Sequence, residues 1–142
     1  MQAFESTVDA NAQSFRANRA AMIDLVQTVR ALEQRTVQAS EKSALRFAKR
    51  GQLLPRERLA RLLDPGTPFL ELMSLAGYCG IENPDPGSSV PGSAIIAGIG
   101  FVSGARVMVV VNDSGINAGA MQHLTGRKVM RCQEIALENR LP

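Results

Sequence analysis

The chain has 142 residues, a formal net charge of +3 and 45% hydrophobic residues, with no Trp, one Tyr and five Phe. This length fits one domain, or a helical arm followed by part of a larger domain, and the apolar share excludes a wholly disordered chain. No apolar run reaches the roughly 20 residues of a membrane span. The first residues also lack the basic and apolar pattern of a secretory signal. The sequence therefore predicts a cytoplasmic protein without a membrane partner.

Positive charge is concentrated in the first part of the chain. Residues 1–62 carry a balance of +5, and the remaining residues carry −2. A basic arm of this kind binds nucleic acid or an acidic partner, or it is a solvated helical face. Acidic residues are interspersed among the bases, which favours the solvated face, and we expect no nucleic acid partner.

Residues 5–50 contain neither Pro nor Gly and are predicted to form a helix. Gly51 is a natural helix end. Within this segment the apolar residues recur at helical spacing and form one stripe. The stripe consists of Met22, Leu25, Val26, Val29 and Leu32. It requires a cover, either from this domain or from another subunit.

A second helix is predicted to begin near Pro55, where a proline costs no hydrogen bond. It ends at the turn sequence of residues 64–66 and is followed by an extended run from Phe69 to Met73. Residues 82–93 hold three prolines and two glycines, which predicts an irregular loop and marks a candidate boundary.

Two strands are predicted next, Ala94 to Val102 and Arg106 to Asn112, with Ser103-Gly104 as a tight hairpin turn. Residues 107–111 show no alternation of polar and apolar side chains, which is typical of a strand that is covered on both faces.

A loop over residues 113–118 leads to a predicted helix over residues 119–139. Its expected inner stripe consists of Val129, Cys132, Ile135 and Ala136. The succession of strand, strand, loop and helix indicates the α/β fold class.

Most familiar catalytic patterns are missing from this sequence. Cys79 and Cys132 do not have a metal-ligand spacing and are expected to be free thiols in a reducing compartment. His123, the one histidine, has no assignable nucleophile or orienting partner. Gly98 and Gly100 lie inside a predicted strand, so they are not a dinucleotide-binding fingerprint. We expect no metal ion and assign no catalytic side chain.

The loop at Ala118, Gly119 and Ala120 is a candidate site, because small residues let a ligand approach the backbone. N–H groups at the start of the following helix would stabilise a developing oxyanion there. Small residues at such a joint also serve simple packing. Asp113 and Ser114 suit the bracing of a turn.

Four segments in a fixed order resemble one family. They are residues 51–72, residues 92–104, residues 110–114 with 117–120, and residues 126–142, which include Arg127, Lys128 and Arg131. They lie within residues 51–142, which make up about two thirds of the chain. The pattern is similar to the N-terminal portion of the carboxyltransferase (β) subunit of biotin-dependent acyl-CoA carboxylases, in the branch that acts on methylcrotonyl-CoA, geranyl-CoA or propionyl-CoA.

The resemblance implies a helical N-terminal arm, residues 1–50, and the start of the acyl-CoA carboxyltransferase N-terminal domain, residues 51–142. In this domain the first strand-strand-helix unit of a crotonase-like fold would be present. The implied reaction moves a carboxyl group from carboxybiotin to an acyl-CoA. The biotin is carried by a partner biotin carboxylase or biotin carrier subunit, and the complete carboxyltransferase is a homo-oligomer.

The resemblance also assigns site residues. The backbone of Ala118, Gly119 and Ala120 would line the acyl-CoA site. The side chains of Asp113, Ser114 and Asn117 would shape the loop. The basic cluster Arg127, Lys128 and Arg131 would contact a CoA phosphate, or would simply face solvent.

The sequence departs from the family in two respects. Family members often have adjacent glycines where this chain has Ala118-Gly119-Ala120, so an alanine methyl group is expected to narrow the pocket or to alter specificity. They are also several times longer, and their principal oxyanion donors come after the segment matched here. The resemblance therefore predicts that this chain alone is inactive. The alternative is a non-catalytic interaction fragment that docks on a partner carboxylase subunit through its amphipathic helix.

Overall fold

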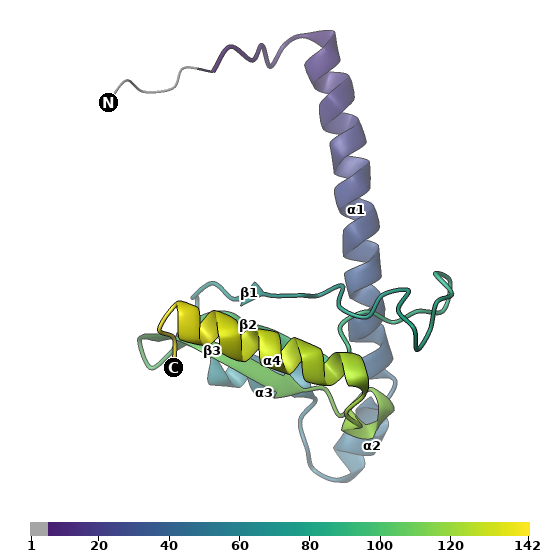
Figure 1. Ribbon diagram of the computed structural model, residues 1–142, viewed down its shortest axis with the longest axis vertical. Coiled ribbons are helices and arrows are strands. Elements are labelled where there is room, and N and C mark those ends of the chain that lie inside the picture. The colour runs from purple at the N-terminus through teal and green to yellow at the C-terminus, as the bar shows by residue number, and fades with distance from the viewer. Residues whose placement is uncertain (1–5) are drawn as a thin grey trace. The chain divides into compact units, whose positions relative to one another are not determined.

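The computed structural model describes residues 6–142 and divides the chain into two compact units, with the boundary after Ala31. The first unit holds the N-terminal part of helix α1, Gln13–Glu41, and the second unit holds its C-terminal turns and all other elements (Figure 1). No helix among the described residues is long and apolar enough to cross a bilayer.

The single helix predicted over residues 5–50 is wrong in its extent. Residue 5 lies outside the described residues, α1 begins at Gln13, and a break after Glu41 separates it from α2, Ala44–Lys49. At this break Ser43 Oγ donates a hydrogen bond of 2.8 Å to the carbonyl oxygen of Gly115. The break therefore depends on a tertiary contact, which the absence of Pro and Gly cannot reveal.

The predicted helix end at Gly51 is confirmed. Gly51 has a φ of +62°, and Gln52 N–H bonds back to the carbonyl of Phe47 at 3.0 Å, as in a Schellman motif. Helix α3, Pro55–Leu62, begins at the predicted proline, and Glu57 accepts a hydrogen bond from Leu54 N–H at 2.8 Å.

One three-stranded antiparallel sheet has the order β1-β2-β3. Its strands are β1, Leu70–Glu71, β2, Ile95–Val102, and β3, Ala105–Asn112. Ser103 and Gly104 have φ angles of +51° and +77°, as a tight hairpin turn requires. The carboxylate of Asp64 accepts hydrogen bonds from both of their N–H groups, at 2.8 and 2.7 Å, a contact that the sequence did not indicate.

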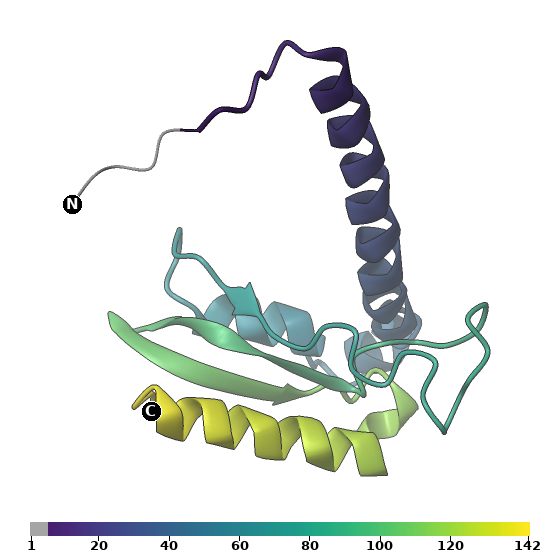
Figure 2. The same ribbon diagram turned by 45° about the horizontal axis from the view of Figure 1, so that its top comes forward.

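Helices cover both faces of the sheet (Figure 2). On one face α3 packs Leu59 against Ile96 and Val109. On the other face α4, His123–Glu138, packs Cys132 against Ile95 and Ala97. Full burial of one aliphatic side chain contributes roughly 1.5–3 kcal/mol, so these small clusters hold the layers together.

The prediction that strand 107–111 is covered on both faces is confirmed in part. Val109 is buried on the side of α3, and Met108 packs on the side of α4. Val110, however, is 41% exposed. Cover of β3, which lies at the end of the sheet order, is therefore incomplete at Val110.

The loop over residues 82–93 lies inside the second unit and is not a boundary. Arg35 donates a hydrogen bond of 2.6 Å to the carbonyl of Pro86, and Thr36 donates one of 2.8 Å to the carbonyl of Pro91. Ser89 is buried and accepts a bond from Cys79 N–H. The loop is therefore held against the C-terminal turns of α1.

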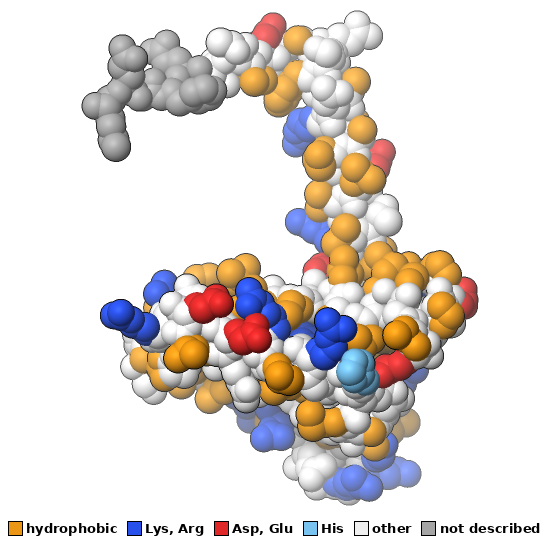
Figure 3. Space-filling model, in the orientation of Figure 1, with side chains coloured by type: hydrophobic (Ala, Val, Ile, Leu, Met, Phe, Trp, Pro, Cys, Tyr) orange, Lys and Arg blue, Asp and Glu red, His pale blue; other side chains and the backbone are white. Residues whose placement is uncertain are grey.

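The apolar stripe of α1 remains exposed within the first unit. Met22 and Leu25 are about 60% exposed, and Val26 and Val29 are each 41% exposed. Hydrophobic side chains are visible along this helix in the space-filling view (Figure 3).

Candidate functional site

The loop after β3 is built around Asp113, which is fully buried. Its Oδ1 accepts hydrogen bonds from Ser40 Oγ at 2.7 Å and from Gly115 N–H at 3.1 Å. Arg46 donates a bond of 3.0 Å to the carbonyl of Ser114. Asp113 and Ser114 thus fix the course of the loop. Their contacts indicate a structural role and not a nucleophilic one.

The next residues form a short 3₁₀ turn, η1, Asn117–Gly119, in an unusual conformation. Asn117, Ala118 and Gly119 have φ angles of +46°, +54° and +79°. A left-handed alanine costs on the order of 1–2 kcal/mol. Glycine would adopt this conformation at position 118 without that cost. The surrounding loop stabilises the strained Ala118 backbone, since Asn112 Nδ2 donates a hydrogen bond of 3.0 Å to the carbonyl of Gly119.

The predicted start of the last helix at residue 119 is wrong. The left-handed residues cannot continue into a right-handed helix, so α4 begins at His123, after an extended Gln122 whose N–H donates to Thr125 Oγ1 at 3.2 Å. Two residues, Met121 and Gln122, therefore separate Ala120 from the first turn of α4.

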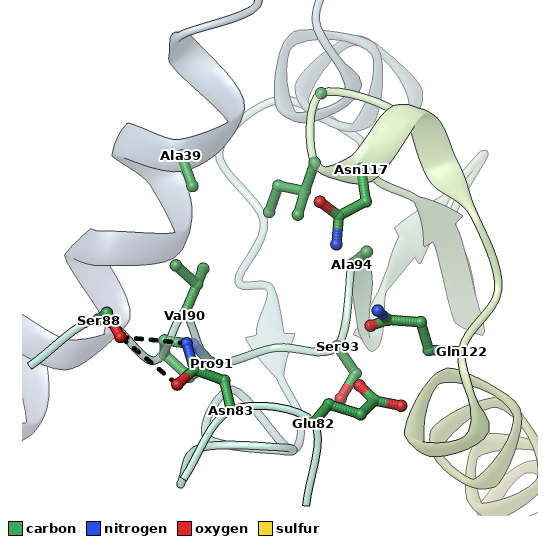
Figure 4. A pocket seen from close by; sticks show the side chains of 12 residues that line it. Ala39, Glu82, Asn83, Ser88, Val90, Pro91, Ser93, Ala94, Asn117 and Gln122 are labelled. Atoms are coloured by element: carbon green, nitrogen blue, oxygen red, sulfur yellow. Dashed lines mark hydrogen bonds between the residues drawn. The ribbon is translucent and has the colours of Figure 1, made fainter. Parts of the chain in front are cut away.

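A cavity of about 380 Å³ opens beside this loop (Figure 4). Three parts of the second unit line it, namely the end of α1, the loop before β2 and the loop after β3. Its lining includes Ala39, Glu82, Asn83, Ser88, Val90, Pro91, Ser93, Ala94, Gly115, Ile116, Asn117 and Gln122. The side chain of Asn117 points into this space in Figure 4.

Of the predicted loop residues, Asn117 alone lines this cavity, whereas Ala118 and Ala120 are exposed beside it. Glu82, Ser93 and Gln122 also line the cavity, and no sequence pattern marked them as site residues. The Pro- and Gly-rich composition of residues 82–93 indicated a loop, but nothing in it indicated that this loop would face residues 115–122.

The basic cluster of α4 borders a second hollow of about 400 Å³, next to residues 73–77. Its three members differ in environment. Arg127 is exposed, and Arg131 pairs with Glu134 at 2.8 Å. Lys128 is 2% exposed and donates to the carbonyl oxygens of Gly92 and Ile95, at 3.2 and 2.6 Å. Burial lowers the pKa of Lys128, and the bond to Glu134 raises the pKa of Arg131.

His123 is exposed at the start of α4. Within residues 6–142, no group of three or more His, Cys, Asp or Glu side chains is placed to hold a metal ion.

The fold identifies the class of protein first. A hairpin that leads through a loop into a helix lying on the sheet is the layer expected for a crotonase-like carboxyltransferase fold. The solved β subunit of geranyl-CoA carboxylase from P. aeruginosa has this arrangement, with a TM-score of 0.89 and 45% identity over 99% of this chain and 26% of that chain. The second unit, Leu32–Pro142, is thus part of such a domain.

The family follows from the sequence comparisons. The model of the carboxyl transferase domain family matches residues 46–142, so the chain belongs to this family. It is 48% identical over 105 residues to the biotin-dependent 3-methylcrotonyl-coenzyme A carboxylase beta1 subunit of Mycobacterium tuberculosis, which covers 72% of this chain and 18% of that protein.

A second relative is the mitochondrial methylcrotonoyl-CoA carboxylase beta chain of Arabidopsis thaliana. It is 39% identical over 136 residues, which is 95% of this chain and 22% of that protein. The chain therefore spans about a fifth of the length of these two curated relatives.

Proposed function

We propose that this chain is the N-terminal portion of an acyl-CoA carboxylase carboxyltransferase subunit, and that residues 113–122 form one wall of its acyl-CoA site. The observation that supports this proposal is the family match over residues 46–142 together with the polar cavity beside Asn117. The substrates named for the relatives favour a branched or isoprenoid acyl group.

In the proposed reaction, carboxybiotin supplies an activated carboxyl group and is carried by a partner biotin carboxylase or carrier subunit. Asn117 and Gln122 bring amide groups to the cavity, and Ser93 brings a hydroxyl oxygen whose proton is donated to the carbonyl of Ala76 at 3.1 Å. These groups fit a thioester carbonyl or a ureido ring equally well. In this chain they would bind and orient a ligand, and hydrogen-bond donors near the thioester oxygen would stabilise charge that develops there.

Contact with a CoA phosphate is best assigned to Arg127. Its guanidinium is exposed at the hollow beside residues 73–77, whereas Arg131 is engaged with Glu134 and Lys128 with backbone carbonyls. We therefore expect Arg127 to contribute more to CoA binding than either neighbour.

The residues present here span about a fifth to a quarter of the related chains. We expect them to bind acyl-CoA without turnover when they are expressed alone, because one wall of a site does not assemble the full set of oxyanion donors. We further propose a homo-oligomeric carboxyltransferase in the cytoplasm.

Titration of the ¹⁵N-labelled chain with 3-methylcrotonyl-CoA, geranyl-CoA and free CoA tests the proposal. We expect amide shifts at Ser93 and at residues 117–122 with the two thioesters, and an affinity for both that falls about tenfold in Asn117→Ala. Lys49→Met, an exposed change on α2, is the control. Shifts confined to other surfaces would contradict the proposed site, and carboxylation of either thioester by this chain with carboxybiotin would contradict the expected inactivity.

A second function is supported by the exposed stripe of Met22, Leu25, Val26 and Val29. In this alternative the chain is a non-catalytic fragment that docks on a partner carboxylase subunit through α1. Co-elution with purified carboxylase subunits tests it. Co-elution of a wild-type chain that binds no acyl-CoA, lost in Leu25→Lys, would favour docking over the carboxyltransferase role, and failure of the wild type to co-elute would exclude docking.

A further inference from the structure

The turn that leads into β2 has an unusual backbone. Gly92, Ser93 and Ala94 have φ angles of +93°, +51° and +53°, and Ile95 N–H closes the turn on the carbonyl of Gly92 at 3.1 Å. Ser93 and Ala94 occupy the left-handed region, which disfavours residues with a side chain. Ala94 is also buried. Such a conformation persists only where the surroundings hold it.

The carbonyl groups around this turn are held by donors from several elements. Thr36 on α1 donates to Pro91, and Thr125 on α4 donates to Ser93 at 2.9 Å. The N–H of Asp113 donates to Ala94 at 2.8 Å. The remaining two carbonyls, those of Gly92 and Ile95, both accept from the ammonium group of Lys128.

Lys128 is the one of these donors that carries a charge into the interior. Burial of an ammonium group is costly unless hydrogen bonds offset it, and an apolar side chain would avoid the cost altogether. The charged or titratable groups that act on it are Glu71 on β1, Arg56 on α3 and Cys132 on α4. Glu71 is itself paired with Arg56 at 2.9 Å, so the carbonyls of the turn are the direct partners of Lys128.

The turn is also a wall of the cavity that contains Asn117. Pro91, Ser93 and Ala94 line this cavity. Within the described chain, the N–H groups of Ser93 and Ala94 donate to no protein acceptor. Two backbone donors are thus available in a turn whose carbonyl groups accept hydrogen bonds from Lys128, among other donors.

We propose that Lys128 is a positioning residue for ligand binding: it holds the Gly92–Ile95 turn so that Ser93 and Ala94 offer their N–H groups to an oxygen atom of the bound acyl-CoA. The inference rests on the proposed function for the identity of the ligand. It differs from the expectation that Lys128 contacts a CoA phosphate, because here Lys128 acts through the turn and does not touch the ligand.

The test compares the wild-type chain with Lys128→Met and Lys128→Arg, and uses Lys49→Met as the matched control at an exposed position. Hydrogen exchange at the amides of Ile95 and Asp113 reports the turn, because both amides bond within it. Titration with 3-methylcrotonyl-CoA reports binding.

In Lys128→Met we expect at least tenfold faster exchange at both amides, about tenfold weaker binding and loss of the ligand-induced shifts at Ser93 and Ala94. Lys128→Arg, which keeps a charged donor, should restore part of the slow exchange, of the affinity and of the ligand-induced shifts. Lys49→Met should match the wild type. Unchanged exchange in Lys128→Met would overturn the proposal, and so would faster exchange with unchanged affinity.

A measurement on the wild type covers the case in which Lys128→Met fails to fold. A hydrogen-bonded, buried ammonium group exchanges its protons slowly, so its ¹⁵Nζ signal should be observable and should shift on ligand binding. A rapidly exchanging Lys128 signal would overturn the proposal. A wild-type chain that binds no acyl-CoA would instead contradict the proposed function, and the ligand named in this inference would fall with it. Hydrogen exchange in the variants would still decide whether Lys128 holds the turn.

Discussion

The hydroxyl group of Ser40 donates a 2.7 Å hydrogen bond to Oδ1 of Asp113, which lies 73 residues further along the chain. Both side chains are buried, at 3% and 0% exposure. This bond joins the end of α1 to the loop that borders the candidate site, so the helical segment before residue 50 takes part in shaping the loop.

Ser40→Ala should therefore destabilise the chain by about 1–3 kcal/mol, because it removes a bond to a buried carboxylate whose other oxygen already has no partner among the described residues. Urea unfolding measures the change. Ser14→Ala, an exposed change on the same helix, should stay within about 0.5 kcal/mol. Equal effects of the two substitutions would show that the Ser40–Asp113 bond contributes little.

Two glycines should respond to alanine in opposite directions. A Cβ at Gly98 would collide with the carbonyl of Leu70 and with the ring of Phe69, whereas a Cβ at Gly126 on α4 would meet nothing within 4 Å. Gly98→Ala should cost about 1–3 kcal/mol. Gly126→Ala should stabilise by about 0.5–1 kcal/mol, because alanine is the better helix former. Thermal unfolding of both variants measures this, and a stable Gly98→Ala would mean that β1 does not approach β2 so closely.

The two cysteines should differ in reactivity. Both are free; Cys79 is exposed and Cys132 is fully buried. Burial raises the pKa of the Cys132 thiol, an effect that nearby Lys128 partly opposes, so little thiolate forms at neutral pH. Alkylation with iodoacetamide should modify Cys79 quickly and Cys132 only after unfolding. Peptide mapping reads out both sites, with Cys79→Ser as the control. Rapid modification of Cys132 in the folded chain would contradict its position under α4.

The pH dependence of stability should report Lys128. Burial lowers its folded-state pKa below the ordinary value of 10.5. Between the folded-state pKa and 10.5 the unfolded state binds more protons than the folded state, so the free energy of unfolding rises with pH in this range. Below the folded-state pKa the full cost of burying the charge acts, and above 10.5 it is gone.

The stability of the wild type relative to Lys128→Met should therefore increase as the pH rises toward 10.5. A neutral amine still has two N–H groups for the two carbonyls, so the turn survives deprotonation. Urea unfolding at about pH 7 and about pH 10 measures the trend. The same comparison with Lys49→Met should show no trend, and a falling difference would contradict the buried position of Lys128.

Much of the second unit was predictable from local pattern. The turn residues Gly51, Pro55 and Ser103-Gly104 gave the correct ends for α2, α3 and the hairpin, because their backbone preferences act within a few residues. The ordered motifs also gave the correct family and fold class. Among the helix boundaries that were wrong, the break after Glu41 involves a contact with distant residues, and the start at His123 follows three successive left-handed residues.

The candidate site shows the same division. Sequence determined that a loop of small and polar residues follows β3, since residue type alone fixes that chemistry. The tertiary structure decided that Asn117 faces Ser93 across a cavity and that Lys128 turns inward while Arg127 stays in solvent. Helical spacing places residues on a face, but which carbonyls lie beneath that face depends on how α4 packs on the sheet, and this packing is a property of the whole fold.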